Sequence, residues 1–483
     1  MTGGGPGHSG MACLTPLVNL HLDPEGWVTV CAANKREPLG HVADAPLLDL
    51  WRGEGAARFR SRFVDGGVSG GCEMCRWQQA TAGHDAMYAR IYDHLDASEP
   101  AWPRHLELTL SSACNLQCVM CNGAFSSSIR LHREGLPTRP SAYDDRFFEQ
   151  LPPFLAHAET AKFLGGEPFL APENLRVWEL VAELSSKPAC HVTTNGTVFN
   201  RRVAELLDAV PMSFAVSMDG ATAATVERIR AGARYVDVVA NLDRFAAHVE
   251  RNGTSLSLTY CLMTENWHEL ADFLLFADDR DLPVFVNTVT SPTRLSVYHR
   301  PPGELAAIVE SLDRIDEEVR ARLGRNRAVW DDQLRRLRSA CEAPINDGEV
   351  PVHFPGFVHP PKVPVPRSPS ADEAEAELVA WSGGGAVAQL VVDPTGRIAS
   401  VEGDLPGVHL GRLHQLGIDE LYLWLQSALG RLDGSTYLRH APEAGDRILF
   451  FAGAGERTEV RLVSGADADQ TAWWRVASRV APT

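Results

Sequence analysis

The chain alternates between strand-like and helix-like segments, and this alternation limits the folds that it can adopt. Amphipathic stretches such as 177–184 and 239–247, with apolar residues at the i, i+3, i+4 spacing of a helix, lie between short apolar runs. Repeated strand–helix units predict a parallel sheet with right-handed crossovers. Six units favour a curved, partly open (β/α)6 barrel of the α/β class over a closed eightfold one. The strand-like runs lie near 105–111, 161–166, 190–195, 213–219, 256–263 and 283–289.

Three closely spaced cysteines follow the first of these runs. Cys114, Cys118 and Cys121 form a C-x₃-C-x₂-C pattern. Iron–sulfur cubanes normally have four thiolate ligands, so a cluster with three leaves one iron open to another molecule. The pattern therefore predicts a [4Fe–4S] cluster with an open site, and a structural zinc site is the alternative for clustered cysteines.

Further motifs lie at the carboxyl ends of the next strands, where parallel α/β folds gather their chemistry. Gly165-Gly166-Glu167-Pro168 ends the second run. Paired glycines, which have no Cβ atom, would let a ligand approach the backbone closely. The segments 193–197 and 217–220 follow the third and fourth runs and carry polar side chains.

These motifs, in this order, resemble those of the radical S-adenosylmethionine (SAM) superfamily. The resemblance implies that the open iron binds the amino and carboxylate groups of SAM, and that electron transfer from a flavodoxin- or ferredoxin-type reductant yields a 5′-deoxyadenosyl radical. It further implies that the GGEP motif meets the SAM amino group, that Asn195 and Ser217 contact the nucleoside, and that an arginine lies near the SAM carboxylate. The implied cofactor-binding residues are Gly165, Gly166, Glu167, Asn195, Ser217, Asp219 and Arg230, with Arg228 as the alternative arginine one turn away.

The N-terminal segment carries a second set of cysteines. Two of them bracket Gly26 in a C-x₁₂-G-x₄-C pattern, and a C-x₂-C pair follows. The pattern resembles the twitch module (SPASM in its longer form), which implies an auxiliary [4Fe–4S] cluster. The turn at 23–26 would join two strands into a hairpin, and zinc remains the alternative ligand. The four cysteines are Cys13, Cys31, Cys72 and Cys75.

A related pattern recurs near the other end of the chain. Residues 390–398 echo residues 20–28, but Val401 stands where Cys31 would be. We therefore expect residues 376–483 to form a cysteine-free, twitch-like α+β module that covers the barrel mouth or shapes the substrate pocket. An unrelated small α+β domain with a similar hairpin is the equal alternative.

Proline-rich segments mark the expected domain boundaries. Two prolines near 95–103 precede the barrel, and seven prolines between 351 and 369 mark an extended linker. The predicted units are 1–98 for the twitch-like module, 99–300 for the barrel, 301–350 for a helical extension, 351–375 for the linker and 376–483 for the C-terminal module.

Composition disfavours several classes of partner. A net charge of −17 disfavours sequence-independent nucleic-acid binding, which needs basic surface. No apolar stretch approaches membrane-spanning length and the N-terminus lacks a signal pattern, so we expect a cytoplasmic protein with no nucleic-acid or membrane partner. Only four of the 45 basic residues are lysines, a bias that fits a GC-rich bacterial genome.

Cys261, near the C-terminal end of the fifth run, is the candidate catalytic residue. If its side chain faces the inside of the barrel, its thiol could return a hydrogen atom to the opposite face of a substrate radical. The result would be epimerisation, and in this respect the chain resembles radical SAM epimerases of sugar and peptide natural products. A buried cysteine that packs as a small apolar group is the alternative. Cys190 opens a strand at the wrong end for chemistry, and Cys341 belongs to a helix end.

Three functions compete on this evidence. The first is a redox-neutral epimerase of a small natural product, such as an oligosaccharide antibiotic, with Cys261 as the hydrogen donor. The second is a radical dehydrogenase or peptide-modifying enzyme in which the auxiliary cluster accepts the second electron. The third, a non-catalytic iron–sulfur or zinc scaffold, would leave the SAM-binding motifs without a use. The expected substrate is therefore a small molecule or glycoside, with a peptide as the alternative.

Overall fold

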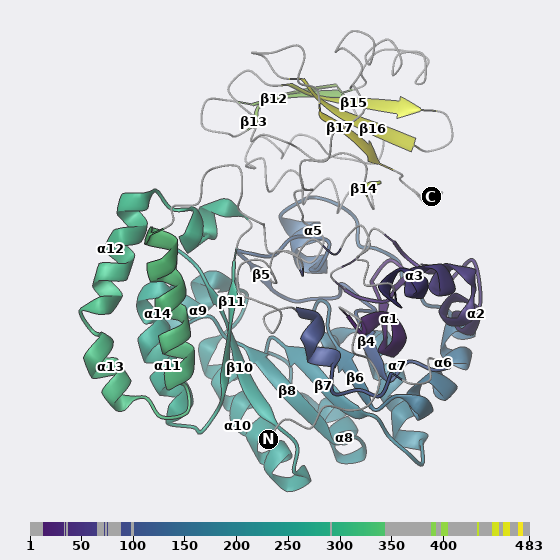
Figure 1. Ribbon diagram of the computed structural model, residues 1–483, viewed down its shortest axis with the longest axis horizontal. Coiled ribbons are helices and arrows are strands. Elements are labelled where there is room, and N and C mark those ends of the chain that lie inside the picture. Colours follow the sequence, from purple (N-terminus) through teal and green to yellow (C-terminus); the bar gives the residue numbers. More distant parts are fainter. Residues whose placement is uncertain are drawn as a thin grey trace.

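The computed structural model describes residues 13–32, 34, 37–64, 72, 75, 88–97, 101–289 and 292–342, together with the backbone of six strands between 388 and 476. Its centre is a nine-stranded sheet with the order β11-β10-β8-β7-β6-β4-β1-β2-β3 (Figure 1). The strands are β1 (Asn19–Leu22), β2 (Trp27–Thr29), β3 (Gly40–His41), β4 (His105–Leu108), β6 (Thr160–Phe163), β7 (Ala189–Thr194), β8 (Met212–Ser217), β10 (Leu256–Leu262) and β11 (Val284–Thr288).

Six of these strands form the predicted parallel barrel wall. The strands from β4 to β11 pair in parallel with their neighbours, and each lies within one of the predicted runs or starts one residue before it. The predicted partial (β/α)6 fold is therefore confirmed. Helices cover its outer face (Figure 1), and the helical extension follows the last strand. The helices are α6 (Asp145–His157), α7 (Pro172–Glu183), α8 (Arg201–Ala209), α10 (Tyr235–Asn252), α11 (Leu270–Asp278), α12 (Pro302–Asp313), α13 (Asp316–Arg322) and α14 (Arg327–Glu342).

The two faces of the barrel sheet differ in polarity. Residues that alternate along each strand, such as Phe163 and Val192, pack against helix residues such as Trp178 and Phe245 in one large core. The side chains between them point to the other face, which we call the inner face. Buried parallel sheets are usually apolar on both faces, so a polar inner face indicates a functional surface.

The N-terminal cysteine module is built onto the barrel sheet. β1 and β2 form the predicted antiparallel hairpin, in which the Gly26 amide donates to the Asp23 carbonyl (3.0 Å). Gly26 has φ +87°, a conformation that favours glycine. β1 also pairs in parallel with β4, with Leu22 opposite Leu108. The module therefore extends the sheet that carries the cluster loop.

The C-terminal strands form a separate six-stranded sheet with the order β13-β12-β15-β16-β17-β14. β12 and β13 pair in an antiparallel hairpin, as the sequence echo predicts. Unlike β1, β12 pairs only with antiparallel neighbours. Two further similarities in sequence, Gly411 to Gly40 and residues 418–422 to residues 47–51, lie outside the described residues, so the twitch-like assignment of this module stays a prediction. The strands are β12 (Ala388–Val392), β13 (Ile398–Gly403), β14 (Leu432–Asp433), β15 (Arg447–Gly453), β16 (Arg457–Val463) and β17 (Ala472–Val476).

Within the described residues, no helix has both the length and the apolar character needed to cross a membrane.

Candidate functional site

The loop after β4 holds the cysteine triad in a defined conformation. Its short strand β5 (Gln117–Cys118) pairs with β9 (Arg230–Ala231), which sets Cys118 opposite Arg230. The Cys114 amide donates to Ser127 Oγ (3.1 Å) in the first turn of helix α5 (Ser127–His132). The cap residue of that helix, Ser126, donates its hydroxyl to the Leu116 carbonyl (2.7 Å). The loop is therefore fixed from two sides.

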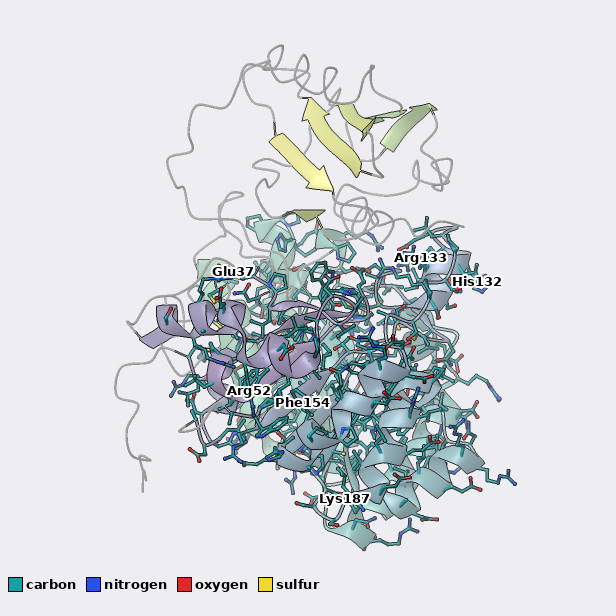
Figure 2. All side chains as sticks on the ribbon, turned by 90° about the vertical axis from the view of Figure 1, so that its right-hand side faces the viewer. Glu37, Arg52, His132, Arg133, Phe154 and Lys187 are labelled. Atoms are coloured by element: carbon teal, nitrogen blue, oxygen red, sulfur yellow. The ribbon has the colours of Figure 1, made fainter. Side chains whose placement is uncertain are left out.

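The triad has the chemistry of a metal-cluster site. All three thiols are partly buried, and burial raises the pKa of Cys118 to about 11 and that of Cys121 to about 12. Burial also raises the pKa of Cys114. Such thiols are neutral in the absence of metal, whereas a bound metal deprotonates them. Arg133, on the outer side in Figure 2, donates to the carbonyls of Cys118 (3.3 Å) and Cys121 and steadies the loop.

The paired glycines let the cluster loop pack against the end of β6. A Cβ atom on Gly165 would lie 2.5 Å from the Ser111 carbonyl oxygen, and one on Gly166 would lie 2.3 Å from that of Ala113. The Gly166 and Glu167 amides donate to the same two carbonyls (3.1 and 2.7 Å). The sequence predicted room for a ligand here. The structure adds a second reason for the glycines, which is the close approach of the protein's own backbone.

Glu167 joins the ends of two strands. It is fully buried, and its carboxylate accepts hydrogen bonds from the Asn195 amide (2.7 Å), the Thr194 hydroxyl (2.8 Å) and the Phe169 amide (3.2 Å). Burial raises its pKa to about 7 against these hydrogen bonds. Because both oxygens are bonded within the protein, Glu167 acts on the site by positioning Asn195.

Asn195 lies beside the triad. Its Nδ2 donates to Asn115 Oδ1 (3.1 Å) and lies 4.0 Å from Cys114 Sγ. Its Oδ1 accepts from the Thr197 amide (2.9 Å) and hydroxyl (2.6 Å). The structure thus brings this predicted residue to the cluster loop. Sequence reasoning missed Asn115, although its place inside the C-x₃-C segment was a signal.

A buried ion pair lies next to Cys118. Arg230 Nη2 lies 2.8 Å from Asp219 Oδ2, and the two side chains are 9% and 0% exposed. Burial disfavours the charged form of both side chains. It raises the pKa of Asp219. For Arg230, burial would lower the pKa, but the attraction of Asp219 outweighs this effect and keeps the pKa above its ordinary value. Arg230 Nε is buried without a hydrogen-bond partner in the described part of the chain. This free donor beside the triad suits an anionic group of a bound cofactor.

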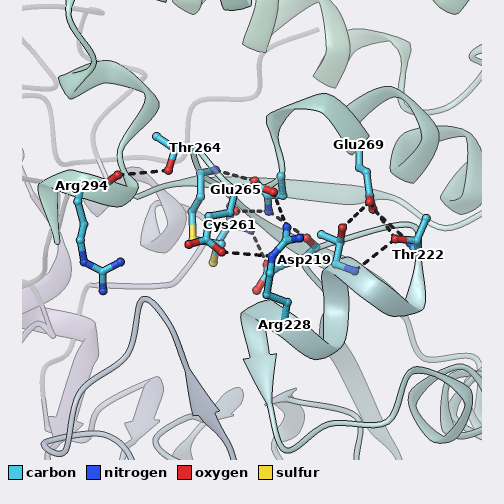
Figure 3. A network of polar contacts seen from close by, with 11 residues as sticks. Asp219, Thr222, Arg228, Cys261, Thr264, Glu265, Glu269 and Arg294 are labelled. Carbon is cyan, nitrogen blue, oxygen red and sulfur yellow. Dashed lines mark hydrogen bonds and ion pairs between the residues drawn. The ribbon is translucent and has the colours of Figure 1, made fainter. Parts of the chain in front are cut away.

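The structure separates the two candidate arginines. The Arg228 side chain is 52% exposed, donates to the Glu265 carbonyl (2.8 Å) and pairs with the Glu265 carboxylate (3.5 Å) (Figure 3). It therefore lies outside the group of residues gathered around the triad. Ser217 accepts from the Thr259 hydroxyl (3.0 Å) on the inner face.

Cys261 lies on the inner face near the triad. Its neighbours on β10, Tyr260 and Leu262, are buried in the helix-covered core, so Cys261 points the other way. Its amide donates to Asp219 Oδ1 (2.7 Å). Burial and then Asp219 raise its pKa well above the ordinary value, and Cys118 adds to the effect. The thiol therefore stays protonated at neutral pH.

Two polar residues that follow β10 were missed by sequence reasoning. Asn266 is fully buried and its Nδ2 donates to the carbonyls of Asp219 and Cys261 (2.9 Å each). Glu269 accepts from the Ala221 amide (2.8 Å) and the Thr222 hydroxyl (2.9 Å) at the N-terminus of helix α9 (Ala223–Ile229), which follows β8. Their position just after a strand end was the available signal.

The N-terminal cysteines also gather. Cys13, Cys31 and Cys72 pack around Val30 and Phe59. Burial raises the pKa of Cys13 to about 12, and Cys75 and Cys72 contribute to the shift. Within the described residues, no group of three or more His, Cys, Asp or Glu side chains is arranged to hold a metal ion.

The remaining cysteines lie elsewhere. Cys190 is buried in the helix-covered core, where burial raises its pKa to about 12, and Cys341 lies on α14 at the edge of that core.

Two protein-family models match the segments of the chain that carry the two cysteine sets. Residues 108–277 match the model of the radical SAM superfamily, and residues 13–76 match that of an iron–sulfur cluster-binding domain, SPASM. The first match contains the triad and the strand-end motifs. The second match contains all four N-terminal cysteines, which favours an iron–sulfur cluster over zinc.

Curated relatives match through part of their length. The chain is 29% identical over 182 residues to the GTP 3′,8-cyclase of Streptomyces coelicolor, a match that covers 36% of this chain and 50% of the relative. It is 27% identical over 182 residues to the GTP 3′,8-cyclase of Synechococcus elongatus, covering 38% and 53%. The chain thus spans about half the length of the curated relatives it matches.

Solved structures match at lower identity. anSMEcpe with bound AdoMet is 18% identical, with a TM-score of 0.32, covering 44% of this chain and 60% of that one. SuiB of Streptococcus suis bound to S-adenosylmethionine is 16% identical, with a TM-score of 0.32, covering 45% and 48%.

The two domain matches imply a [4Fe–4S] cluster that binds SAM and an auxiliary iron–sulfur cluster. The described residues fit the first cofactor in their chemistry: three partly buried thiols on one loop, glycines that admit this loop, and an unpaired buried arginine nitrogen. In the described residues the three thiols do not converge at metal-ligand distance. The chain therefore contains a domain of the radical SAM superfamily, preceded by an iron–sulfur cluster-binding domain of the SPASM type.

Proposed function

We propose that the protein is a radical SAM enzyme that epimerises a stereocentre of a small natural product, of the sugar or oligosaccharide class, with Cys261 as the hydrogen-atom donor. When bound, the cluster and SAM supply a 5′-deoxyadenosyl radical that removes a hydrogen atom from a substrate C–H bond. The observation that carries the proposal is the position of Cys261, on the inner face and bonded through its amide to Asp219, the partner of Arg230.

The chain's own residues hold the cofactor in this proposal. Cys114, Cys118 and Cys121 supply the thiolates, and the unpaired Nε of Arg230 offers a donor to the SAM carboxylate. Asn195 lies close enough to Cys114 to contact the nucleoside end of a cofactor bound at the cluster.

Cys261 supplies the hydrogen atom from its neutral thiol. A pKa well above the ordinary value keeps the S–H bond intact at neutral pH. Transfer of the hydrogen atom to the substrate radical forms a new C–H bond and leaves a sulfur-centred radical. One electron and one proton then restore the thiol, and a flavodoxin- or ferredoxin-type reductant would supply the electron.

A second candidate is oxidation of the substrate radical, in a dehydrogenase or a peptide-modifying enzyme. The packing of Cys13, Cys31 and Cys72 around one apolar pair favours it, because an auxiliary cluster there would accept the second electron. This reaction has no need of Cys261.

The test compares Cys261→Ala with Cys190→Ala, a control in the apolar core. After anaerobic reconstitution, about eight irons per chain are expected from two cubanes. Oligosaccharide and peptide natural products are then screened in D₂O for formation of 5′-deoxyadenosine and for deuterium at an inverted carbon. An epimerase loses inversion in Cys261→Ala and keeps it in Cys190→Ala. Equal inversion in both variants would contradict the donor role, and a dehydrogenated product from wild-type protein would favour the second candidate.

A further inference from the structure

A row of polar side chains crosses the inner face of the barrel below the SAM site. Strand register sets His21 opposite Glu107, Glu107 opposite Lys162, Lys162 opposite His191, and His191 opposite Ser213. Partners in register point to the same face of a sheet. We call these five residues the polar row.

Solvent reaches part of this row. His191 is exposed and Lys162 is partly exposed, whereas Ala161 and Val192, on the other face, are buried. On the edge strand β11, the inner-facing Phe285 is 61% exposed. Closed α/β barrels fill their interior with branched apolar side chains, so accessible polar groups here indicate an open space that takes a polar molecule.

Lys162 is a partly buried cation whose ammonium group has no hydrogen-bond or ion-pair partner among the described residues. Glu107, its neighbour in the row, is 1% exposed and accepts from the Tyr92 hydroxyl (3.4 Å) instead. Two histidines also flank Lys162, His191 on β7 and His105 on β4. Lys162 contributes, after burial, to the lowered pKa values of both. Buried or half-buried charges are usually paired, so this lysine suits an anion from outside the chain.

The row lies at the right depth for a substrate. Lys162 comes three residues before Gly165, and His191 comes four residues before Asn195. At about 3.3 Å per residue, the row lies about 10–13 Å below the residues that would hold SAM. A molecule anchored at Lys162 would therefore extend toward the reacting end of the cofactor.

We infer that Lys162 and His191 bind an oxyanion of the substrate, a carboxylate or a phosphoryl group, which makes the substrate an acidic sugar or a sugar phosphate. The role of this anion in a reaction rests on the proposed function, whereas the anion site itself is defined by Lys162 and His191 alone. Lysine binds either group by charge-assisted hydrogen bonds.

The test measures binding of three matched probes to the anaerobically reconstituted full chain by calorimetry: glucuronate, glucose 6-phosphate and glucose. We expect at least one anionic probe to bind about tenfold to a hundredfold more tightly than glucose, and the tighter of the two anions identifies the group. Lys162→Gln should remove this preference. Lys187→Gln is the control, because Lys187 is exposed at the far end of the barrel and bonds only backbone carbonyls (Figure 2). Equal affinity for glucose and the anions, or an unchanged preference in Lys162→Gln, would overturn the inference.

A labelling experiment on the wild-type chain covers the case in which Lys162→Gln does not fold. Trace acetylation, read by mass spectrometry, should modify Lys162 less in the presence of the tighter anionic probe and Lys187 equally in both conditions. Loss of this protection would also overturn the inference. Wild-type protein that shows anion binding but releases no 5′-deoxyadenosine would contradict the proposed function and still support the anion site.

Discussion

Arg230 Nη2 lies 2.8 Å from Asp219 Oδ2, inside the protein, at the point where the cluster loop meets the barrel. β5–β9 pairing sets Arg230 opposite Cys118, and Asp219 also accepts the amide of Cys261. One carboxylate therefore connects the arginine beside the cluster with the strand that carries the candidate hydrogen donor.

Arg230→Gln should weaken both folding and SAM binding. The substitution leaves Asp219 as a buried charge without its partner, a change that typically costs about 3–5 kcal/mol. Denaturant unfolding and equilibrium SAM binding measure the two effects. Arg228→Gln is the control, because this half-exposed side chain should change the free energy of unfolding by about 0.5 kcal/mol or less. Wild-type SAM affinity in Arg230→Gln would contradict the assigned position of the arginine.

Gly166→Ala should prevent assembly of the SAM-binding cluster. The new Cβ atom would lie 2.3 Å from the Ala113 carbonyl oxygen, so the cluster loop must move. Iron analysis after reconstitution should fall from about eight to about four per chain. Gly303→Ala is the control, since a Cβ atom there meets nothing within 4 Å. Full iron content in Gly166→Ala would show that the loop tolerates the shift.

Glu269→Gln should destabilise the fold in a pH-dependent way. Burial opposes ionisation of Glu269, but hydrogen bonds from Thr225, Thr222 and the Ala221 amide outweigh it and hold its pKa below the ordinary value of 4.5. A carboxyl group with a lowered folded-state pKa contributes stability that is complete above its unfolded pKa and is lost as pH falls through the folded pKa. Denaturant unfolding should therefore show a loss of about 1–3 kcal/mol in Glu269→Gln at pH 7.

That difference should shrink as the pH falls below about 4.5, where the carboxyl group takes up a proton in the unfolded chain, and it should vanish once the pH passes the lower folded-state pKa. Glu205→Gln, an exposed glutamate that pairs with Arg201 on the surface, is the control and should show little difference at either pH. A constant difference across this pH range would indicate that the hydrogen bonds do not depend on the charge.

Asn266→Ala should cost about 3 kcal/mol or more of folding stability. The side chain is buried and makes three hydrogen bonds, to the carbonyls of Asp219 and Cys261 and from the Met263 amide. Each buried group left unsatisfied costs about 1–3 kcal/mol. Thermal or denaturant unfolding measures the change, with the exposed Asn252→Ala as the control. Equal stability of the two variants would mean that water replaces the lost bonds.

The parallel barrel, the two cysteine sets and the strand-end motifs could be predicted from the residues alone. Each of these is local: the strand–helix alternation is a property of short windows, and Cys114, Cys118 and Cys121 lie within eight residues of each other. The order of the motifs was sufficient to place them at one edge of the sheet, because parallel strands share the direction of their carboxyl ends.

Which side chains meet depends on the pairing of strands that are distant in the chain. Arg228 and Arg230 are equivalent as sequence, and the β5–β9 pairing sets only Arg230 beside Cys118. The polar row depends on the register of five strands far apart in the chain, and a shift of any one strand by one residue would turn its member of the row to the other face. Local patterns fix which face of a strand is polar, but long-range pairing sets the neighbours across it, and so only the fold could bring Lys162 and His191 together.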